Sequence, residues 1–231
     1  MTTIALVHGA FHGGWCWDAV IPALTRAGHR AVAPDLPIED PDAGALAYAR
    51  VVCDSVGDAA DVVVVGHSLG GLVVPVVAAL RPVRRMVFVA GLVPRPGSPF
   101  VEEMAAHSDA LQGGASAAPD PRSVTPRRPF DVARERYYHD VPVAVARRAW
   151  ERQRPQAQAP MAEACPLEAW PAVPSSSIVM TDDHAVSITY SHEVAESILR
   201  TAPIELPGSH SPFLSRPAEL AEVILRCVST V

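Results

Sequence analysis

A serine flanked by glycines directly follows an apolar run: residues 62–70 read VVVVGHSLG. A β-strand that leads into the pattern G-x-S-x-G and then into a helix holds the serine hydroxyl clear of the sheet on a sharp turn. Gly66 and Gly70 fit such a turn, because strand and helix approach each other there too closely for a Cβ atom. Ser68 is therefore the candidate nucleophile.

A serine hydroxyl is a weak nucleophile near neutral pH, so it needs a base, a group that orients the base, and donors for the oxyanion. His210 is the best candidate base among the nine histidines, because it lies on a loop between the last predicted strand and the last predicted helix. Asp182 and Asp183 both follow a predicted strand, and either carboxylate could reach this histidine. The spacing alone does not choose between the two aspartates.

The loop after the first predicted strand, residues 8–14, reads HGAFHGG. Its glycines allow backbone N–H groups to turn toward a bound carbonyl, and we expect the amides of Ala10 and Leu69 to form an oxyanion hole. The alternative, a phosphate-binding loop, does not fit, because neither glycine-rich segment matches G-x-G-x-x-G or the P-loop pattern. We therefore expect no nucleotide site.

Three further histidines, His8, His12 and His67, are expected to brace loops or line the pocket rather than to act as bases. Phe11, His12 and Phe213 are predicted to contact the substrate. No carboxylate or cysteine shares a metal-ligand spacing with these three histidines, so no metal is expected.

The elements that must position these residues alternate along the chain. The predicted strands cover residues 4–7, 30–34, 61–65, 85–90, 176–180 and 203–206, and the predicted helices cover residues 15–27, 44–56, 69–80, 192–200 and 217–228. Gly28 is a plausible helix C-cap, and Pro75 should kink the helix that follows the serine. Alternating strands and helices predict an α/β fold with a mostly parallel sheet of about six strands and helices on both faces.

Residues 94–174 interrupt this alternation, with 13 of the 23 prolines and no convincing strand. A loop this long inside a compact domain favours a function, and we interpret the segment as a helical cap over the site rather than a surface excursion. Within it, Pro142 suits the first turn of a helix with Val143, Ala146, Ala149 and Trp150 on one face. The expected division is a core of residues 1–93 and 175–231 with a cap insertion of residues 94–174.

Composition excludes several classes of protein. The formal net charge is −6 and all 19 basic residues are arginine, which argues against a nucleic-acid partner and excludes a lysine nucleophile. Without a long apolar stretch or a secretory signal, the chain is expected to be cytoplasmic, with a small-molecule substrate and no membrane partner. The four widely spaced cysteines are expected to be reduced and mostly buried. The oligomeric state stays open, and a homodimer is among the states allowed.

Several segments resemble one superfamily: LVHGAFHGGWCW at residues 6–17, AGH at 27–29, PDL at 34–36, GHSLGG at 66–71 and GSHSPFLSRP at 208–217. They resemble the α/β-hydrolase superfamily, and more narrowly its branch of plant methylesterases of the salicylic-acid-binding type, hydroxynitrile lyases and bacterial esterase-like relatives. The similarity covers nearly the whole chain outside residues 94–174. It implies the α/β-hydrolase fold, a catalytic triad, an oxyanion hole and a helical cap inserted after the strand that ends near Ala90.

The resemblance also bears on the two aspartates and on the reaction. In relatives the triad acid commonly follows a threonine by two residues and precedes an aliphatic residue, and TDDHAV at residues 181–186 fits that pattern with Asp183. Hydroxynitrile lyases carry a threonine and a lysine where this chain has Gly9 and Ser211, which weakens the cyanohydrin alternative. Epoxide hydrolases and haloalkane dehalogenases carry an aspartate in place of Ser68, which argues against both.

We therefore expect a cofactor-free serine hydrolase that cleaves a carboxylic ester, such as a small methyl or aryl ester, through an acyl-enzyme intermediate. In this hypothesis Ser68 attacks, His210 transfers the proton, Asp183 holds the imidazole, and the amides of Ala10 and Leu69 stabilise the oxyanion. The alternatives are a lyase, cyclase or thioesterase acting on a specialised-metabolism substrate with the same fold, and a non-catalytic small-molecule receptor.

Overall fold

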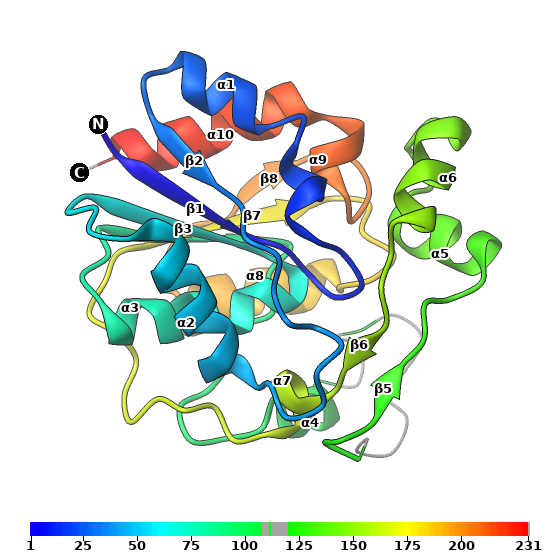
Figure 1. Ribbon diagram of the computed structural model, residues 1–231, viewed down its shortest axis with the longest axis horizontal. Coiled ribbons are helices and arrows are strands. Elements are labelled where there is room, and N and C mark those ends of the chain that lie inside the picture. Colours follow the sequence, from blue (N-terminus) through cyan, green and yellow to red (C-terminus); the bar gives the residue numbers. More distant parts are fainter. Residues whose placement is uncertain (108–110, 112–119, 231) are drawn as a thin grey trace.

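The computed structural model describes residues 1–107, 111 and 120–230, and Figure 1 shows a sheet with helices on both of its faces. The sheet consists of β1 (Thr3–Val7), β2 (Arg30–Val32), β3 (Val62–His67), β4 (Arg85–Val89), β7 (Ser175–Met180) and β8 (Ile204–Leu206). Its strands run in the order β2-β1-β3-β4-β7-β8, and every neighbouring pair is parallel. The predicted six-stranded parallel α/β fold is confirmed.

The apolar strands alternate their side chains between two hydrophobic cores. Val62 and Val64 of β3 pack in one core, and Val63 and Val65 pack in the other. The first core lies under α2 (Ala45–Val56), α3 (Val74–Leu80) and α8 (Ile188–Ser197), and the second lies under α1 (Ile21–Arg26) and α10 (Pro217–Ser229). A parallel strand covered on both faces reads as a continuous apolar run, which is why this strand is legible in the sequence.

Prolines divide two helices that the sequence predicts as continuous. Instead of one helix over residues 15–27, the chain forms a short 3₁₀ helix, Gly14–Trp17, and then α1, which has Pro22 in its first turn. Likewise a 3₁₀ helix, Ser68–Leu72, precedes α3, and Pro75 lies in the first turn of α3. Proline lacks the N–H that an interior position needs, so it begins each helix here rather than kinking it.

The other helix boundaries lie close to prediction with one exception. Helix α2 covers almost the predicted range, α10 extends to Ser229, and Gly28 follows α1 with a φ of +87°. Helix α8 begins at Ile188, four residues before the predicted start, because Ser187 caps it by accepting a hydrogen bond from the Tyr190 N–H at 3.3 Å.

The segment predicted as an insertion contains four helices and one small sheet in its described part. The helices are α4 (Phe100–Ala106), α5 (Phe130–Tyr137), α6 (Val143–Glu151) and α7 (Ala159–Ala162). The prediction that it holds no strand is wrong, since β5 (Val124–Thr125) and β6 (Gln156–Ala157) pair antiparallel. Part of the segment, residues 108–110 and 112–119, lies outside the described residues.

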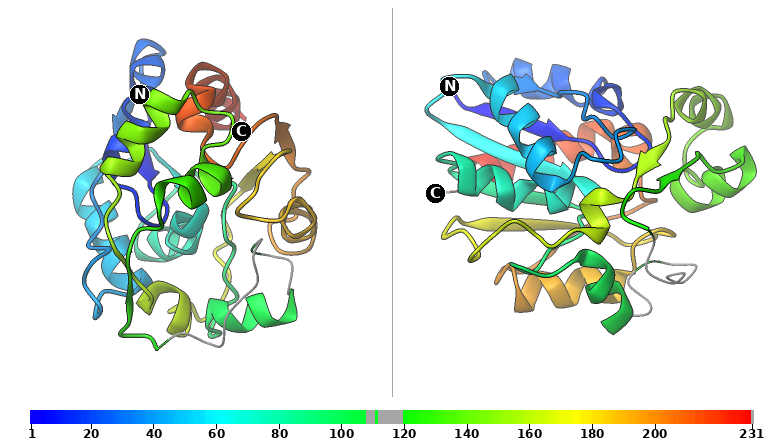
Figure 2. Two further views of the ribbon diagram at one scale, coloured as in Figure 1. Left: turned by 90° about the vertical axis from the view of Figure 1, so that its right-hand side faces the viewer. Right: turned by 60° about the horizontal axis from the view of Figure 1, so that its bottom comes forward.

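Helices α5 and α6 stand apart from the rest of the segment, beyond the carboxyl ends of the strands (Figure 2). Pro142 is the N-cap of α6, one residue before the first turn in which the sequence predicts it, and Ala146 and Ala149 are buried in a small core that the two helices share. Val143, predicted on the same face of the helix as these alanines, is 53% exposed. The division of the chain into core and cap at residues 94 and 174 stays a prediction.

Three of the four cysteines are buried free thiols, and Cys53 is a half-buried one, in agreement with the sequence. Among the described residues no helix is both long and apolar enough to cross a membrane.

Candidate active site

The turn after β3 has the strained geometry of a nucleophile elbow. Ser68 has a φ of +51° and is half-buried, whereas His67 before it and Leu69 after it are buried. The flanking glycines are required by close backbone approach: a Cβ on Gly66 would lie 2.6 Å from the Gly70 carbonyl oxygen. Ser68 is thus less buried than the two residues that flank it in the turn.

Adding a methyl group at this turn should damage the site as well as the fold. We expect Gly66→Ala to lower the free energy of unfolding by about 1–3 kcal/mol through overpacking, and to lower esterase activity at least about tenfold because the backbone under Ser68 must move. Urea unfolding and ester hydrolysis check both effects.

The matched control is Gly28→Ala, since a Cβ on Gly28 has nothing within 4 Å and its φ of +87° adds only local backbone strain. This control should lose about 1 kcal/mol of stability and keep full activity. Equal activity in the two variants would contradict the close packing described for the elbow.

The candidate base and acid meet at the carboxyl ends of β7 and β8. The His210 Nδ1–H donates to Asp183 Oδ2 at 2.7 Å, and both side chains are only 3% exposed. The other carboxylate oxygen, Oδ1, accepts from the backbone N–H groups of Ala185 at 2.7 Å and Val186 at 2.9 Å. Asp182 instead has a 65% exposed side chain. The geometry pairs the histidine with Asp183, and leaves its Nε2 as the acceptor.

Ser68 and His210 line one cavity of about 480 Å³. Ala10, Phe11, His12 and Leu69 line it as well, so the residues predicted for the oxyanion hole and for most of the substrate contacts are brought together. Phe213 is the exception: it is fully buried and packs edge-on against His67 with ring centroids 4.9 Å apart, beneath the site rather than in the cavity wall. A fully buried aromatic residue and a pocket-lining one are not distinguishable from the sequence alone.

The segment of residues 94–174 supplies half of the described residues that line the cavity. Val101, Met104 and Met161 contribute apolar surface, and Arg128 and Arg136 contribute charge. Gln156 is 1% exposed, and its Oε1 has no hydrogen-bond partner among the described residues. A buried acceptor without a partner is costly, so this residue is a polar position of the cavity wall with a hydrogen bond unmade.

Comparison with known proteins gives the family of this chain. Residues 4–223 match the model of a family described as the alpha/beta hydrolase family. The chain belongs to this family. As an α/β hydrolase it is 29% identical to a pyrethroid hydrolase of Sphingobium wenxiniae, over 97% of this chain and 86% of the relative.

Two further proteins resemble the hydrolase over most of its length. Methylesterase 2 of Arabidopsis thaliana is 26% identical over 95% of this chain and 93% of its own. The solved structure of an extracellular alpha/beta-hydrolase from a Paenibacillus species superimposes with a TM-score of 0.82 over 100% of both chains, at 21% identity. At that identity the second likeness shows the fold alone.

His67 ties the elbow of the hydrolase to the loop of the candidate base. Its Nε2–H donates to the His210 backbone carbonyl oxygen at 2.8 Å, and the two rings lie 4.6 Å apart. The sequence places this residue at the variable position of G-x-S-x-G, and the expectation that it braces a loop is confirmed. Because this hydrogen bond goes to the backbone of His210, it holds the main-chain position from which the His210 imidazole extends.

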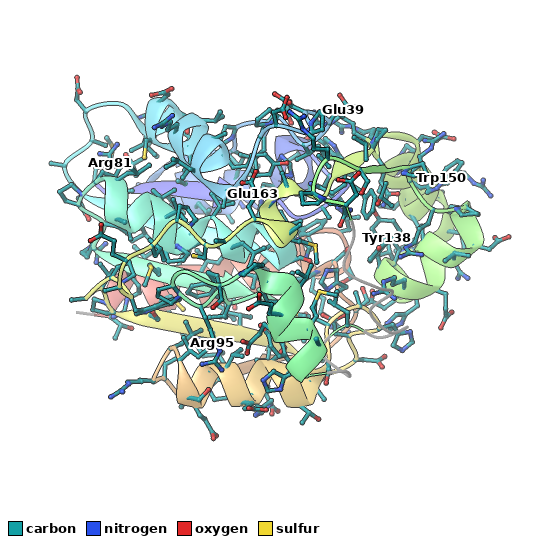
Figure 3. The ribbon with its side chains drawn as sticks, turned by 90° about the horizontal axis from the view of Figure 1, so that it is seen from below. Glu39, Arg81, Arg95, Tyr138, Trp150 and Glu163 are labelled. Atoms are coloured by element: carbon teal, nitrogen blue, oxygen red, sulfur yellow. The ribbon has the colours of Figure 1, made fainter. Side chains whose placement is uncertain are left out.

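A hydrogen-bonded chain connects the helical segment to the glycine-rich loop of the hydrolase. Gln153 Nε2 donates to the Tyr138 hydroxyl at 2.7 Å, the hydroxyl donates to His12 Nε2 at 2.7 Å, and His12 Nδ1–H donates to the Ala10 carbonyl oxygen at 2.7 Å. Tyr138, labelled in Figure 3, lies just after α5 on its inner side. The sequence gives no signal for Tyr138 or Gln153, because Tyr138 and His12 lie 126 residues apart along the chain.

Three buried histidines near the site are held neutral. Burial lowers the pKa of His8 to about 4 and that of His12 to about 3, and it lowers the pKa of His67 well below its ordinary value. Neutral rings agree with the hydrogen bonds, since His8 Nε2 accepts from the Leu36 N–H at 3.0 Å and His12 Nε2 accepts from Tyr138.

These lowered pKa values should make the folded hydrolase sensitive to acid. Above pH 6.5 both rings are neutral in the folded and in the unfolded chain. Below pH 6.5 the unfolded chain binds a proton at each ring, whereas the folded chain binds one only near pH 4 at His8 and near pH 3 at His12. Stability is therefore full above the unfolded pKa and falls with pH, by about 2 kcal/mol for each of these two rings at pH 5. Urea unfolding at pH 7.5 and pH 5 measures the loss.

Replacing one ring isolates its share. His8→Gln should reduce the difference between the two pH values by about 2 kcal/mol, and His192→Gln, at a 35% exposed side chain, should reduce it far less. An unfolding midpoint that stays the same at both pH values would contradict the neutral buried state of these histidines.

Proposed function

We propose that this protein is a serine carboxylic ester hydrolase whose triad is Ser68, His210 and Asp183. The observation that carries the proposal is the buried hydrogen bond between His210 and Asp183, placed so that the histidine shares a cavity with a strained, half-buried serine. The names of the relatives, a pyrethroid hydrolase and a methylesterase, support ester cleavage over the lyase, cyclase, thioesterase and receptor alternatives.

The reaction begins when the Ser68 hydroxyl oxygen attacks the ester carbonyl carbon and His210 Nε2 takes the hydroxyl proton. The carbonyl oxygen becomes an oxyanion, which the backbone N–H groups of Ala10 and Leu69 stabilise. When the ester C–O bond breaks, the histidine returns the proton to the leaving alcohol, and the acyl group stays on the serine. Water, activated by the same histidine, then hydrolyses the acyl-enzyme and restores Ser68.

The substrate class is a small methyl or aryl ester. A cavity of about 480 Å³ encloses a small organic ester rather than a polymer, and the methionines and Val101 offer apolar contacts to its acyl or aryl part. Gln156 and Gln158 add polar side chains to the same wall. No cofactor takes part in this chemistry, so we expect full hydrolysis after dialysis against a chelator.

A panel of p-nitrophenyl and methyl esters with increasing acyl length tests the proposal. We expect a burst of p-nitrophenol followed by a slower steady rate, a decline once the acyl group exceeds the cavity, and labelling of Ser68 by a fluorophosphonate. A protein that binds these esters without turnover and resists the label would instead be a receptor.

A further inference from the structure

Two histidines and an aspartate gather on the surface next to Asp183, outside the cavity already described. Asp182 and His184 flank Asp183 in the loop after β7, and His139 reaches them from the turn after α5. The two imidazole rings stack with centroids 4.0 Å apart, and one ligand atom from each of the three residues lies within 4.8 Å of the others. This cluster takes no part in the proposed hydrolysis.

The hydrogen bonds of the cluster decide which ring nitrogens carry protons. His139 Nε2–H donates to the Asp182 backbone carbonyl oxygen at 2.8 Å. His184 Nδ1 faces two oxygens of Glu135, the carbonyl oxygen at 3.1 Å and carboxylate Oε1 at 3.2 Å, so it is the donor of that ring. The remaining nitrogens, His139 Nδ1 and His184 Nε2, therefore present lone pairs. Metal-ligating histidines are usually oriented in this way, with the other ring N–H donated to a carbonyl or carboxylate.

Both nitrogens lie near the same carboxylate, and because the two rings are stacked, one ring must turn for both lone pairs to meet at one ion. His184 Nε2 lies 3.5 Å from Asp182 Oδ1, and His139 Nδ1 lies 3.8 Å from Asp182 Oδ2. Charge-assisted hydrogen bonds are shorter, at about 2.7–2.9 Å. These two nitrogen–oxygen distances are therefore too long for strong hydrogen bonds between the imidazoles and the carboxylate. Two ligands on one tetrahedral ion with bonds of about 2.0–2.1 Å lie about 3.3 Å apart, which is close to the shorter gap.

We propose that His139, Asp182 and His184 form a binding site for a divalent transition-metal ion of the Zn²⁺ type. Imidazole nitrogen with one carboxylate oxygen suits zinc and its neighbours rather than Mg²⁺ or Ca²⁺, which take oxygen ligands. The side chains are 16%, 65% and 35% exposed in that order, so water completes the coordination. Spacing along the chain gave no sign of this site, because His139 is 43 residues from Asp182.

An ion in this site would join two separate parts of the chain. His139 belongs to the segment that carries α5 and α6, and Asp182 and His184 belong to the loop that holds Asp183 against His210. Binding to the folded state alone stabilises that state by RT ln(1 + L/Kd), where L is the concentration of free ion, so the temperature of unfolding rises with that concentration. The site thus fastens the helical segment to the loop of the candidate triad without touching the reacting groups.

Titration of Zn²⁺ into the tag-free, chelator-treated full chain, followed by calorimetry and thermal unfolding, tests the proposal. We expect one ion per chain and a higher unfolding temperature. Asp182→Asn and His184→Gln should each weaken binding at least about tenfold. The matched control is His192→Gln, which removes a surface histidine paired with one carboxylate, Glu205, at 3.2 Å. This control should bind zinc as the parent does.

The readout is independent of ester hydrolysis, so the test separates this site from the proposed function. The Ser68→Ala protein should bind zinc with the parent affinity whether or not the parent cleaves esters. Circular dichroism of each variant confirms folding, and Asp182→Asn preserves the shape of an exposed side chain. Absence of zinc binding to the parent, or binding that Asp182→Asn and His184→Gln leave intact, would overturn the proposal.

Discussion

Ser68→Ala is expected to lower kcat/KM for a p-nitrophenyl ester by about 10⁴–10⁶-fold, because the acyl-enzyme route ends with the loss of the hydroxyl. Alanine keeps the Cβ that the turn already accommodates, so the fold and the cavity should persist. The oxyanion donors remain, so a residual rate above that of water is expected. Steady-state hydrolysis measures the loss, at protein concentrations high enough to detect the residual rate.

A second serine in the chain provides a control that deletes the same atom elsewhere. Ser215 has a buried Oγ without a hydrogen-bond partner among the described residues, and it does not line the cavity. Ser215→Ala should therefore keep full activity and bind fluorophosphonate as the parent does. If Ser68→Ala retained more than about a tenth of the parent rate, the covalent mechanism would be ruled out.

The parts of the site that the sequence predicts are those with a local signal. Four valines before G-x-S-x-G predict a buried strand and the turn after it, because the apolar run and the two glycines lie within ten residues of one another. The candidate base lies where predicted for a similar reason: it follows the last short strand and precedes a helix that begins with proline. Parallel strands end at one edge of the sheet, so chain order alone brings these loops together.

The parts that escaped prediction depend on packing between distant segments. Nothing local distinguishes Tyr138 from its neighbour Tyr137, yet only the side chain of Tyr138 reaches His12 with its hydroxyl. The sequence is equally ambiguous for Phe213, because an apolar residue beside a catalytic loop can either pack beneath the site or line its cavity. Proline positions were legible as breaks, but whether Pro75 begins or bends a helix is decided by the preceding turn at Ser68, which is itself not α-helical.

Asp183→Asn is expected to lower kcat for ester hydrolysis by about 10³–10⁴-fold at pH 7.5 with little change in KM. The substitution preserves shape and leaves Ser68 untouched, so the effect comes from the proton on the histidine. The backbone N–H groups of Ala185 and Val186 point at Oδ1 of this side chain. An asparagine must place its carbonyl oxygen there, because its amide group would otherwise face two donors.

The amide of that asparagine then points at His210 Nδ1, where the carboxylate oxygen accepts a hydrogen bond at 2.7 Å in the parent. A donor in this position makes Nδ1 the acceptor and moves the ring proton to Nε2, so the neutral imidazole no longer accepts the serine proton. Asp58→Asn, at an exposed aspartate, is the matched control and should stay within about twofold of the parent rate. A loss smaller than about tenfold in Asp183→Asn would mean that another carboxylate, such as Asp182, orients the base. That result would contradict the assignment of Asp183 as the acid of the triad.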